Sequence, residues 1–257
     1  MTSEKKVLIL FEGPKDKAQF LHLAKTFAHL LEEGGYKPVV FGTSIYELYE
    51  PLIAKKEADS LPAYLQSIGK ISAPEGTRPQ DLFSLIYLVF DFDPCYHLFD
   101  PKKIEALRAY FSDETQNGLL YINYPMVEAL LDCKKEGSSL VLTPEFPMEQ
   151  CTSALYKDHV RKDTAFVSPE KHHPFNYLPP KAFAQVSLLT LKRYYEILEI
   201  RPRDIWSFSD GAALLGKEEK ALLAKKVFPL SCFPLMALDY NADDALANWD
   251  RTLHVKS

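Results

Sequence analysis

Two carboxylates with the spacing of a metal site follow a run of buried-strand residues. Asp91 and Asp93 come directly after six apolar residues, Leu85 to Phe90, and Pro94 closes the pair. Side chains two apart on a strand point to the same side, so both carboxylates are expected to converge at the carboxyl end of that strand. Open α/β sheets hold their ligands at this end, and two like charges held there need a cation.

A third acid follows the other short apolar run near the N-terminus. Glu12 comes after Val7 to Phe11, and Gly13 with Pro14 permits a tight turn from strand to helix. Asp16 falls in the first turn of that helix, where the helix dipole stabilises an acid even without a ligand. The sequence therefore predicts a strand, an acidic turn and a helix in succession.

Helical and strand patterns alternate through the first half of the chain. Apolar residues recur with helical spacing over residues 20–31, 45–56, 61–68 and 101–111, and short strand-like runs occupy 38–42 and 119–123. Pro125 then opens a predicted helix that carries Glu128 in its first turn. We therefore expect an α/β fold over residues 1–135, with a mainly parallel sheet flanked by helices.

The pattern changes over residues 136–257. Residues 136–180 show few clean periods, whereas 182–200 and 212–226 have helical spacing, so a mostly helical C-terminal region is expected. Between Thr152 and Arg193, seven basic residues stand against three acidic ones, in a chain whose formal net charge is −5. Lys157 and Arg161, four apart in this basic segment, are candidates for substrate phosphate contacts.

Composition limits the class of protein. With 257 residues, 47% of them hydrophobic, the chain can bury a core, and no stretch approaches the roughly 20 apolar residues of a membrane span. The N-terminal apolar run is too short for a signal peptide, and the four cysteines lack CxxC spacing. These features predict a globular cytoplasmic protein with no membrane partner, no zinc site and no disulfide framework.

The order of these motifs resembles that of a known family. The phrases LILFEGPKDKAQFL and LVFDFDP, followed by INYPMVEALL, are similar to the TOPRIM domain of primases, topoisomerases and OLD-type nucleases. They look closest to the TOPRIM proteins of bacterial anti-phage defence: the OLD-like and RloB-like groups and the effector of the PARIS system. The resemblance covers about the first 135 residues and implies a TOPRIM-like, Rossmann-like fold there.

The resemblance implies a metal-dependent nuclease. In that family the glutamate and both aspartates bind Mg²⁺, with Mn²⁺ as a substitute, which here assigns metal binding and catalysis to Glu12, Asp91 and Asp93. Related nucleases use further acids for a second ion; Asp16 and Glu128 are the matching candidates, Glu128 also as a catalytic residue. Hard oxygen ligands suit Mg²⁺, and such an ion orients and neutralises a scissile phosphate.

A biological role follows from the same resemblance. It implies a toxic effector of abortive infection that cuts RNA such as tRNA, or DNA, and leaves room for a homodimer. OLD proteins carry an ATPase in the same chain, but GxxxxGK[ST] does not occur here, so a separate ATPase or sensor partner is expected to control the nuclease.

Other interpretations remain open. Asp91 and Asp93 could be ordinary turn acids, Asp16 and Glu128 could serve helix starts, and the basic segment could be solvated helix surface. The chain could then be a non-catalytic binding subunit of a defence complex. It could also be another Mg²⁺-dependent phosphoryl-transfer enzyme, although haloacid-dehalogenase-like phosphatases place Asp-x-Asp after their first strand, whereas here the motif follows residue 80.

Overall fold

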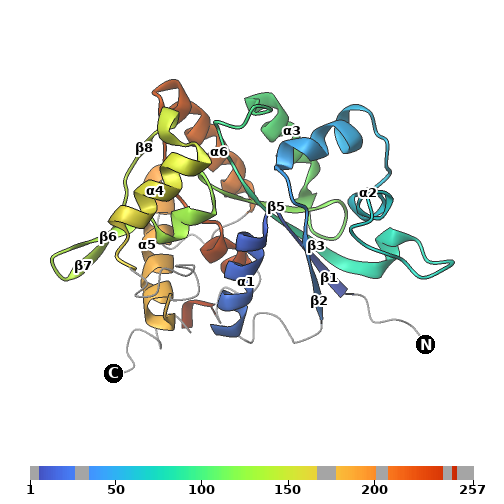
Figure 1. The fold of residues 1–257 in the computed structure, drawn as a ribbon, viewed down its shortest axis with the longest axis horizontal. Coiled ribbons are helices and arrows are strands. Elements are labelled where there is room, and N and C mark those ends of the chain that lie inside the picture. The colour runs from blue at the N-terminus through green and yellow to red at the C-terminus, as the bar shows by residue number, and fades with distance from the viewer. Residues whose placement is uncertain (1–5, 27–34, 167–177, 201–207, 240–244, 248–257) are drawn as a thin grey trace. The chain divides into compact units, whose positions relative to one another are not determined.

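A five-stranded sheet organises the N-terminal half of the molecule (Figure 1). The computed structural model describes residues 6–26, 35–166, 178–200, 208–239 and 245–247. The strand order is β2-β1-β3-β5-β4. The strands are β1 (Lys6–Phe11), β2 (Tyr36–Val40), β3 (Phe83–Asp91), β4 (Ser112–Asp113) and β5 (Gly118–Asn123).

The pairing of β1 with both neighbours makes the sheet mainly parallel. β1 pairs in parallel with β2 and β3, so that Phe11 lies opposite Val40 and Val89, whereas β4 pairs antiparallel with β5. The four residues from Leu8 to Phe11 are fully buried, as expected for a strand covered on both faces. The predicted α/β class with a mainly parallel sheet flanked by helices is confirmed.

Helices connect these strands as the sequence predicts. They are α1 (Pro14–Thr26), α2 (Leu61–Ser67) and α3 (Pro101–Tyr110), with a 3-10 helix η3 (Pro79–Leu82) before β3. Asp100 accepts the backbone N–H of Lys102 and caps α3, and Ser60 caps α2 in the same way through Ala63. The predicted continuation of α1 over residues 27–31 lies outside the described residues.

Two of the predicted helical segments form helices that are not α-helices. Residues 45–56 form a 3-10 helix, η1 (Ile45–Leu48), and a π-helix, η2 (Glu50–Ala54), because Pro51 has no N–H to continue an α-helical ladder. The helix expected from Pro125 begins only at η4 (Val127–Leu131), which is 3-10. Met126 before it is extended, with φ −158° and ψ 175°, so Pro125 cannot be the first helical residue.

The molecule divides into two compact units that interleave along the chain. The first unit comprises Met1–Lys17, Leu31–Asp91 and His97–Tyr121. The second comprises Ala18–Leu30, Phe92–Tyr96 and Ile122–Ser257. The first unit therefore contains most of the sheet with α2 and α3, and the second contains most of α1 and the C-terminal elements.

The second unit mixes helices with short strands. It contains the antiparallel hairpin β6 (Cys133–Glu136) and β7 (Ser139–Leu142), and the short pair β8 (Phe146–Pro147) with β9 (Lys226–Val227). Its helices are η5 (Met148–Gln150), α4 (Ser153–Asp163), α5 (Pro180–Leu198) and α6 (Phe208–Leu223). The two helices predicted here are therefore confirmed as α5 and α6, whereas the hairpin and α4 were not predicted.

A buried acid ties α6 to the residue that follows β9. Glu218 is fully buried, and its Oε2 accepts the backbone N–H of Phe228 at 3.2 Å. Burial raises the pKa of Glu218 well above its usual value, although nearby Arg193 partly opposes the shift. Burial therefore favours the protonated form of this side chain over the charged one.

Close packing of β5 on β3 requires a glycine. Gly118 has φ +117°, a conformation that L side chains rarely adopt. A Cβ atom placed there would lie 2.6 Å from Leu88 Cδ1 and 3.0 Å from Ile86 Cγ2, both on β3. The glycine thus lets β5 begin directly against the strand that ends at Asp91.

We predict that Gly118→Ala lowers the free energy of unfolding by about 2–4 kcal/mol, because it adds steric overlap to an unfavourable φ. Gly137→Ala is the matched control, since Gly137 has φ +63° but an added Cβ would meet nothing within 4 Å. That control is expected to cost only about 1 kcal/mol in urea denaturation. Equal losses for the two variants would contradict the packing role of Gly118.

Candidate functional site

Glu12 and Asp91 are brought together at the carboxyl ends of adjacent parallel strands. Glu12 follows β1, and its backbone N–H donates to Val89 O at 3.1 Å while its carbonyl accepts the N–H of Gly42 at 2.8 Å. Its carboxylate Oε2 accepts the backbone N–H of Asp91 at 3.1 Å. Strand pairing and this hydrogen bond therefore fix the glutamate side chain at the end of β3.

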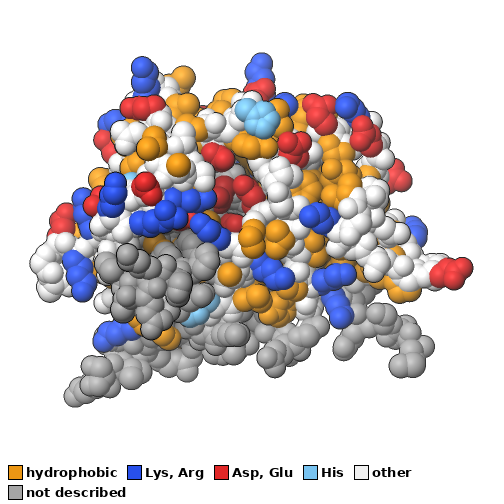
Figure 2. Space-filling view, in the orientation of Figure 1, with side chains coloured by type: hydrophobic (Ala, Val, Ile, Leu, Met, Phe, Trp, Pro, Cys, Tyr) orange, Lys and Arg blue, Asp and Glu red, His pale blue; other side chains and the backbone are white. Residues whose placement is uncertain are grey.

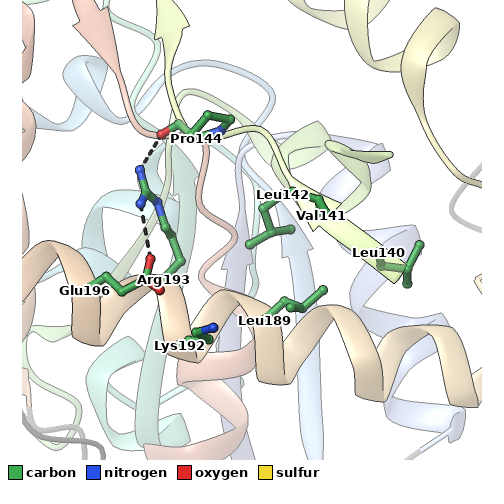
Figure 3. A pocket seen from close by; sticks show the side chains of 8 residues that line it. All are labelled: Leu140, Val141, Leu142, Pro144, Leu189, Lys192, Arg193 and Glu196. Atoms are coloured by element: carbon green, nitrogen blue, oxygen red, sulfur yellow. Dashed lines mark hydrogen bonds and ion pairs between the residues drawn. The ribbon is translucent and has the colours of Figure 1, made fainter. Parts of the chain in front are cut away.

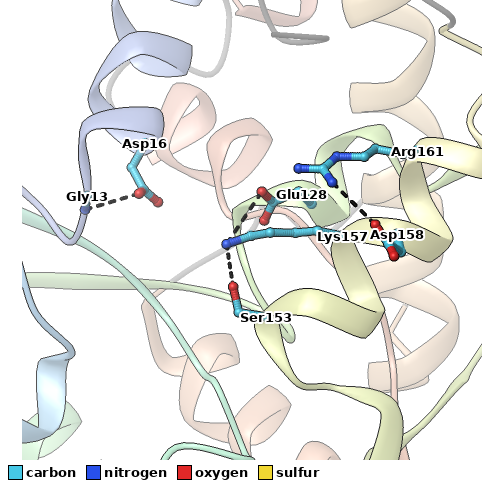
Figure 4. A network of polar contacts seen from close by, with 7 residues as sticks. All are labelled: Gly13, Asp16, Glu128, Ser153, Lys157, Asp158 and Arg161. Atoms are coloured by element: carbon cyan, nitrogen blue, oxygen red, sulfur yellow. Dashed lines mark hydrogen bonds and ion pairs between the residues drawn. The ribbon is translucent and has the colours of Figure 1, made fainter. Parts of the chain in front are cut away.

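Asp16 lies four residues after Glu12, in the first turn of α1. Its Oδ2 accepts the backbone N–H of Gly13 at 3.1 Å, as Figure 4 shows, and the residue is only 3% exposed. This contact has the geometry of an acid at the third helical position reaching back to the N-cap. One carboxylate oxygen of Asp16 therefore serves the turn itself, as the helix-start interpretation expects.

Asp93 lies beyond the strand that positions Asp91. β3 ends at Asp91, and Asp93 has φ 38°, with its N–H donating to Pro125 O at 2.9 Å. The strand alternation expected for the pair therefore does not extend to Asp93. Burial raises the pKa of the Asp93 carboxyl, and the positive charge of Lys157 opposes that shift.

Glu128 and Lys157 form an ion pair within the second unit. Glu128 belongs to η4, its side chain is 7% exposed, and Lys157 Nζ on α4 lies 3.9 Å from its Oε1. Figure 4 shows the same ammonium group donating to Ser153 Oγ, at 2.6 Å. Lys157 thus places a positive charge near two of the predicted site acids, Glu128 and Asp93.

Arg161 is not part of that pair. Its Nη1 lies 3.3 Å from Asp158 Oδ1 on the same helix, and both side chains are more than half exposed. Figure 2 shows Lys and Arg side chains gathered near α4, so this surface of the helix is basic. An exposed ion pair of this kind contributes little to stability. The guanidinium group of Arg161 could therefore leave Asp158 and bind a phosphate at little cost.

A buried network beside Lys157 was not predicted from the sequence. Asp132 is 3% exposed; its Oδ2 accepts the hydroxyl of Tyr156 at 2.7 Å, and its Oδ1 contacts Thr143 Oγ1 and His159 Nε2. His159 Nδ1 also lies 3.1 Å from Asp163 Oδ2. Tyr156 and His159 both belong to α4, so one carboxylate fixes the helix that carries Lys157.

The tyrosine of this network remains protonated. Burial, and then the negative charge of Asp132, raise the pKa of Tyr156 well above its ordinary value. The spacing of Tyr156, His159 and Asp163, at intervals of three and four, was the available signal, since it places all three on one helix face. The partner acid could not be identified, because Asp132 lies 24 residues before Tyr156.

The predicted site residues are divided between the units. The first unit contains Glu12, Asp16 and Asp91, and the second contains Asp93, Glu128, Lys157 and Arg161. All five acids offer oxygen ligands, which suit a hard cation such as Mg²⁺. Among the residues that the structure describes, no group of three or more His, Cys, Asp or Glu side chains is already gathered in a metal-binding arrangement.

We predict that Asp132→Asn lowers the free energy of unfolding by about 2–4 kcal/mol, because it removes a buried charged acceptor from Tyr156 and His159. Asp158→Asn on the same helix is the control, and urea denaturation is expected to show a change within about 0.5 kcal/mol. If the two variants unfold at the same urea concentration, Asp132 does not anchor α4.

Comparisons with protein-family models, with curated proteins and with solved structures found no match to this chain. No helix in the described ranges combines the length and hydropathy that crossing a bilayer requires. The functional interpretation therefore depends on the chemistry of the side chains themselves.

Proposed function

We propose that this protein is a Mg²⁺-dependent TOPRIM nuclease that hydrolyses phosphodiester bonds in RNA or DNA. The observation that carries the proposal is the contact between the Glu12 carboxylate and the backbone N–H of Asp91. This contact lies at the carboxyl ends of β1 and β3. After β1 the chain passes to β2 on one side of β1, and β3 lies on the other side. Ligands of open α/β sheets bind at such a switch point.

The acids near this point suit the assigned metal. Glu12 and Asp91 would hold Mg²⁺ together with Asp93, whose Cα lies at most about 7 Å from that of Asp91 because only Phe92 separates them in the sequence. Asp16 and Glu128 are assigned to a second ion. When bound, the metal would neutralise charge on the scissile phosphate and activate a water molecule.

The protein's own side chains have distinct roles in this proposal. Glu12 is oriented by the Asp91 backbone before any ligand arrives, which lowers the entropy lost on binding. Lys157 balances the negative charge of Glu128 and of Asp93. Arg161, exposed on the same helix, would meet a substrate phosphate from solvent.

The biological role is proposed from the motif resemblance. A free nuclease of this type would be toxic, and we assign it to anti-phage defence under the control of a separate ATPase partner. The sequence supports a separate partner because it has no GxxxxGK[ST] motif of its own.

The second candidate function is a non-catalytic binding subunit. Two contacts favour it: Asp16 caps the turn at Gly13, and Glu128 is paired with Lys157, so both acids have structural roles. In this case the acids would stabilise the fold, their neutral variants would be less stable, and neither wild type nor variants would cleave nucleic acid.

A cleavage assay separates the two candidates. Labelled RNA and DNA are incubated with the protein and Mg²⁺, and we expect cleavage that EDTA abolishes and that Asp91→Asn lowers by at least about 100-fold. Asp81→Asn is the control, because Asp81 forms an exposed ion pair with Arg78 and should retain full activity. Overexpression of wild type, but not of Asp91→Asn, should slow growth. Equal growth and no cleavage by any protein would favour the binding subunit.

A further inference from the structure

A groove runs between the β6–β7 hairpin and α5, within the second unit. Figure 3 shows one part of it, a cavity of about 330 Å³ where Leu140 and Leu142 of β7 face Leu189 of α5. A larger cavity of about 750 Å³ shares Leu140, Leu189 and Lys192 with the first. The two cavities therefore adjoin each other along the helix, and together they are called the groove here.

The helix contributes a stripe of residues with a lysine at each end to this groove. Lys181, Gln185, Leu188 and Lys192 all line it, at helical intervals of four, three and four residues. Lys181 and Lys192 are exposed and lie about 16 Å apart along the helix axis, since each residue rises about 1.5 Å. A charged ligand that runs along α5 would meet both ammonium groups.

The hairpin contributes a third lysine from one of its faces. Lys135 lines the larger cavity with Ser138 and Ser139. Lys135 is paired with Leu140, which lines the same groove, and Lys134 is the next residue along β6. Successive strand side chains point to opposite faces, so Lys134 points away from the face of Lys135.

The charges that line the groove leave an excess of positive charge. Among the described residues that line the two cavities there is one acid, Glu196, which lines the smaller cavity. Arg193 Nη1 lies 3.3 Å from its Oε2. Arg193 also donates to Pro144 O at 2.6 Å, as Figure 3 shows. Within the described ranges, the three groove lysines form no ion pair with an acid.

The floor of the groove is apolar. Phe166, Leu140 and Leu189 line it and are only half-buried. Single-stranded nucleic acid combines regularly spaced phosphates with exposed flat bases, and its binding proteins combine a basic groove with aromatic side chains. A duplex keeps its bases stacked inside, and a lipid surface is too flat to enter a groove, so neither would use this floor.

We propose that this groove binds single-stranded nucleic acid, with Lys135, Lys181 and Lys192 on phosphates and Phe166 stacked on a base. The statement that this nucleic acid is the substrate of the nuclease rests on the function proposed above. Binding itself does not require cleavage and can be measured alone.

Fluorescence anisotropy in EDTA tests the proposal with labelled single-stranded RNA and DNA of about 12 nucleotides. We expect the double variant Lys135→Glu, Lys192→Glu to weaken binding at least about 10-fold and to lower the salt dependence of log Kd by about 0.7 per lost contact. The control is Lys134→Glu, Lys220→Glu, which changes the net charge equally at two exposed residues that do not line the groove. It should bind within about twofold of wild type.

The proposed binding site is wrong if the control variant weakens binding as much as the groove variant, or if wild type binds neither oligonucleotide. It is also wrong if a duplex binds as tightly with the same sensitivity to the variants, or if wild type binds anionic vesicles but neither oligonucleotide. The nuclease proposal fails separately. If wild type binds single strands through the groove but does not cleave them with Mg²⁺, the binding site is supported and the nuclease proposal is contradicted. If groove variants cleave single strands as wild type does, the nuclease proposal is supported and the binding site is contradicted.

Discussion

The parallel pairing of β1 with β3 is the constraint on which the proposed site depends. The register places Phe11 opposite Val89, so the chain leaves both strands at the same level, and Glu12 reaches the backbone of Asp91. β2 and β3 lie on opposite sides of β1, which opens the sheet at this point to a ligand. The tight approach of Gly118 to Ile86 and Leu88 keeps β5 close along the other side of β3.

The contacts of the candidate site acids are the second constraint on the proposed site. In the second unit Lys157 lies near Glu128 and opposes the raised pKa of Asp93, and the Asp132 network holds its helix in place. In the first unit Glu12 and Asp16 each accept a backbone N–H, which orients their carboxylates. Carboxylate oxygens held near the end of a strand are ligands that a hard divalent cation prefers, which is why a metal site is the interpretation we favour there.

The parts of the fold and site that could be predicted were those whose sequence pattern lies within a single segment of the chain. The apolar runs of β1, β3 and β5 and the helical periods of α2, α3 and α5 identified those elements, since burial repeats along each of them. The hairpin β6–β7 was missed because Lys134, Lys135 and Glu136 are exposed and show no alternation. The same local reasoning placed Glu12 and Asp91 each at the end of a strand, but it extended the second strand to Asp93, where the backbone turns to φ 38°. Asp132 was missed because Tyr156 and His159 are remote in sequence, and its role exists only after α4 has packed.

Titration calorimetry with Mg²⁺ and Mn²⁺ tests the central claim most directly, because it requires no knowledge of the substrate. The purified wild-type protein is compared with the double variant Asp91→Asn, Asp93→Asn, after circular dichroism has shown that both are folded. Asp81→Asn, Asp113→Asn serves as a control with the same loss of charge at two acids outside the predicted site. We expect wild type and control to bind metal and the site variant to lose binding. Equal binding by all three proteins, or none by wild type, would contradict a metal site at the carboxyl ends of β1 and β3.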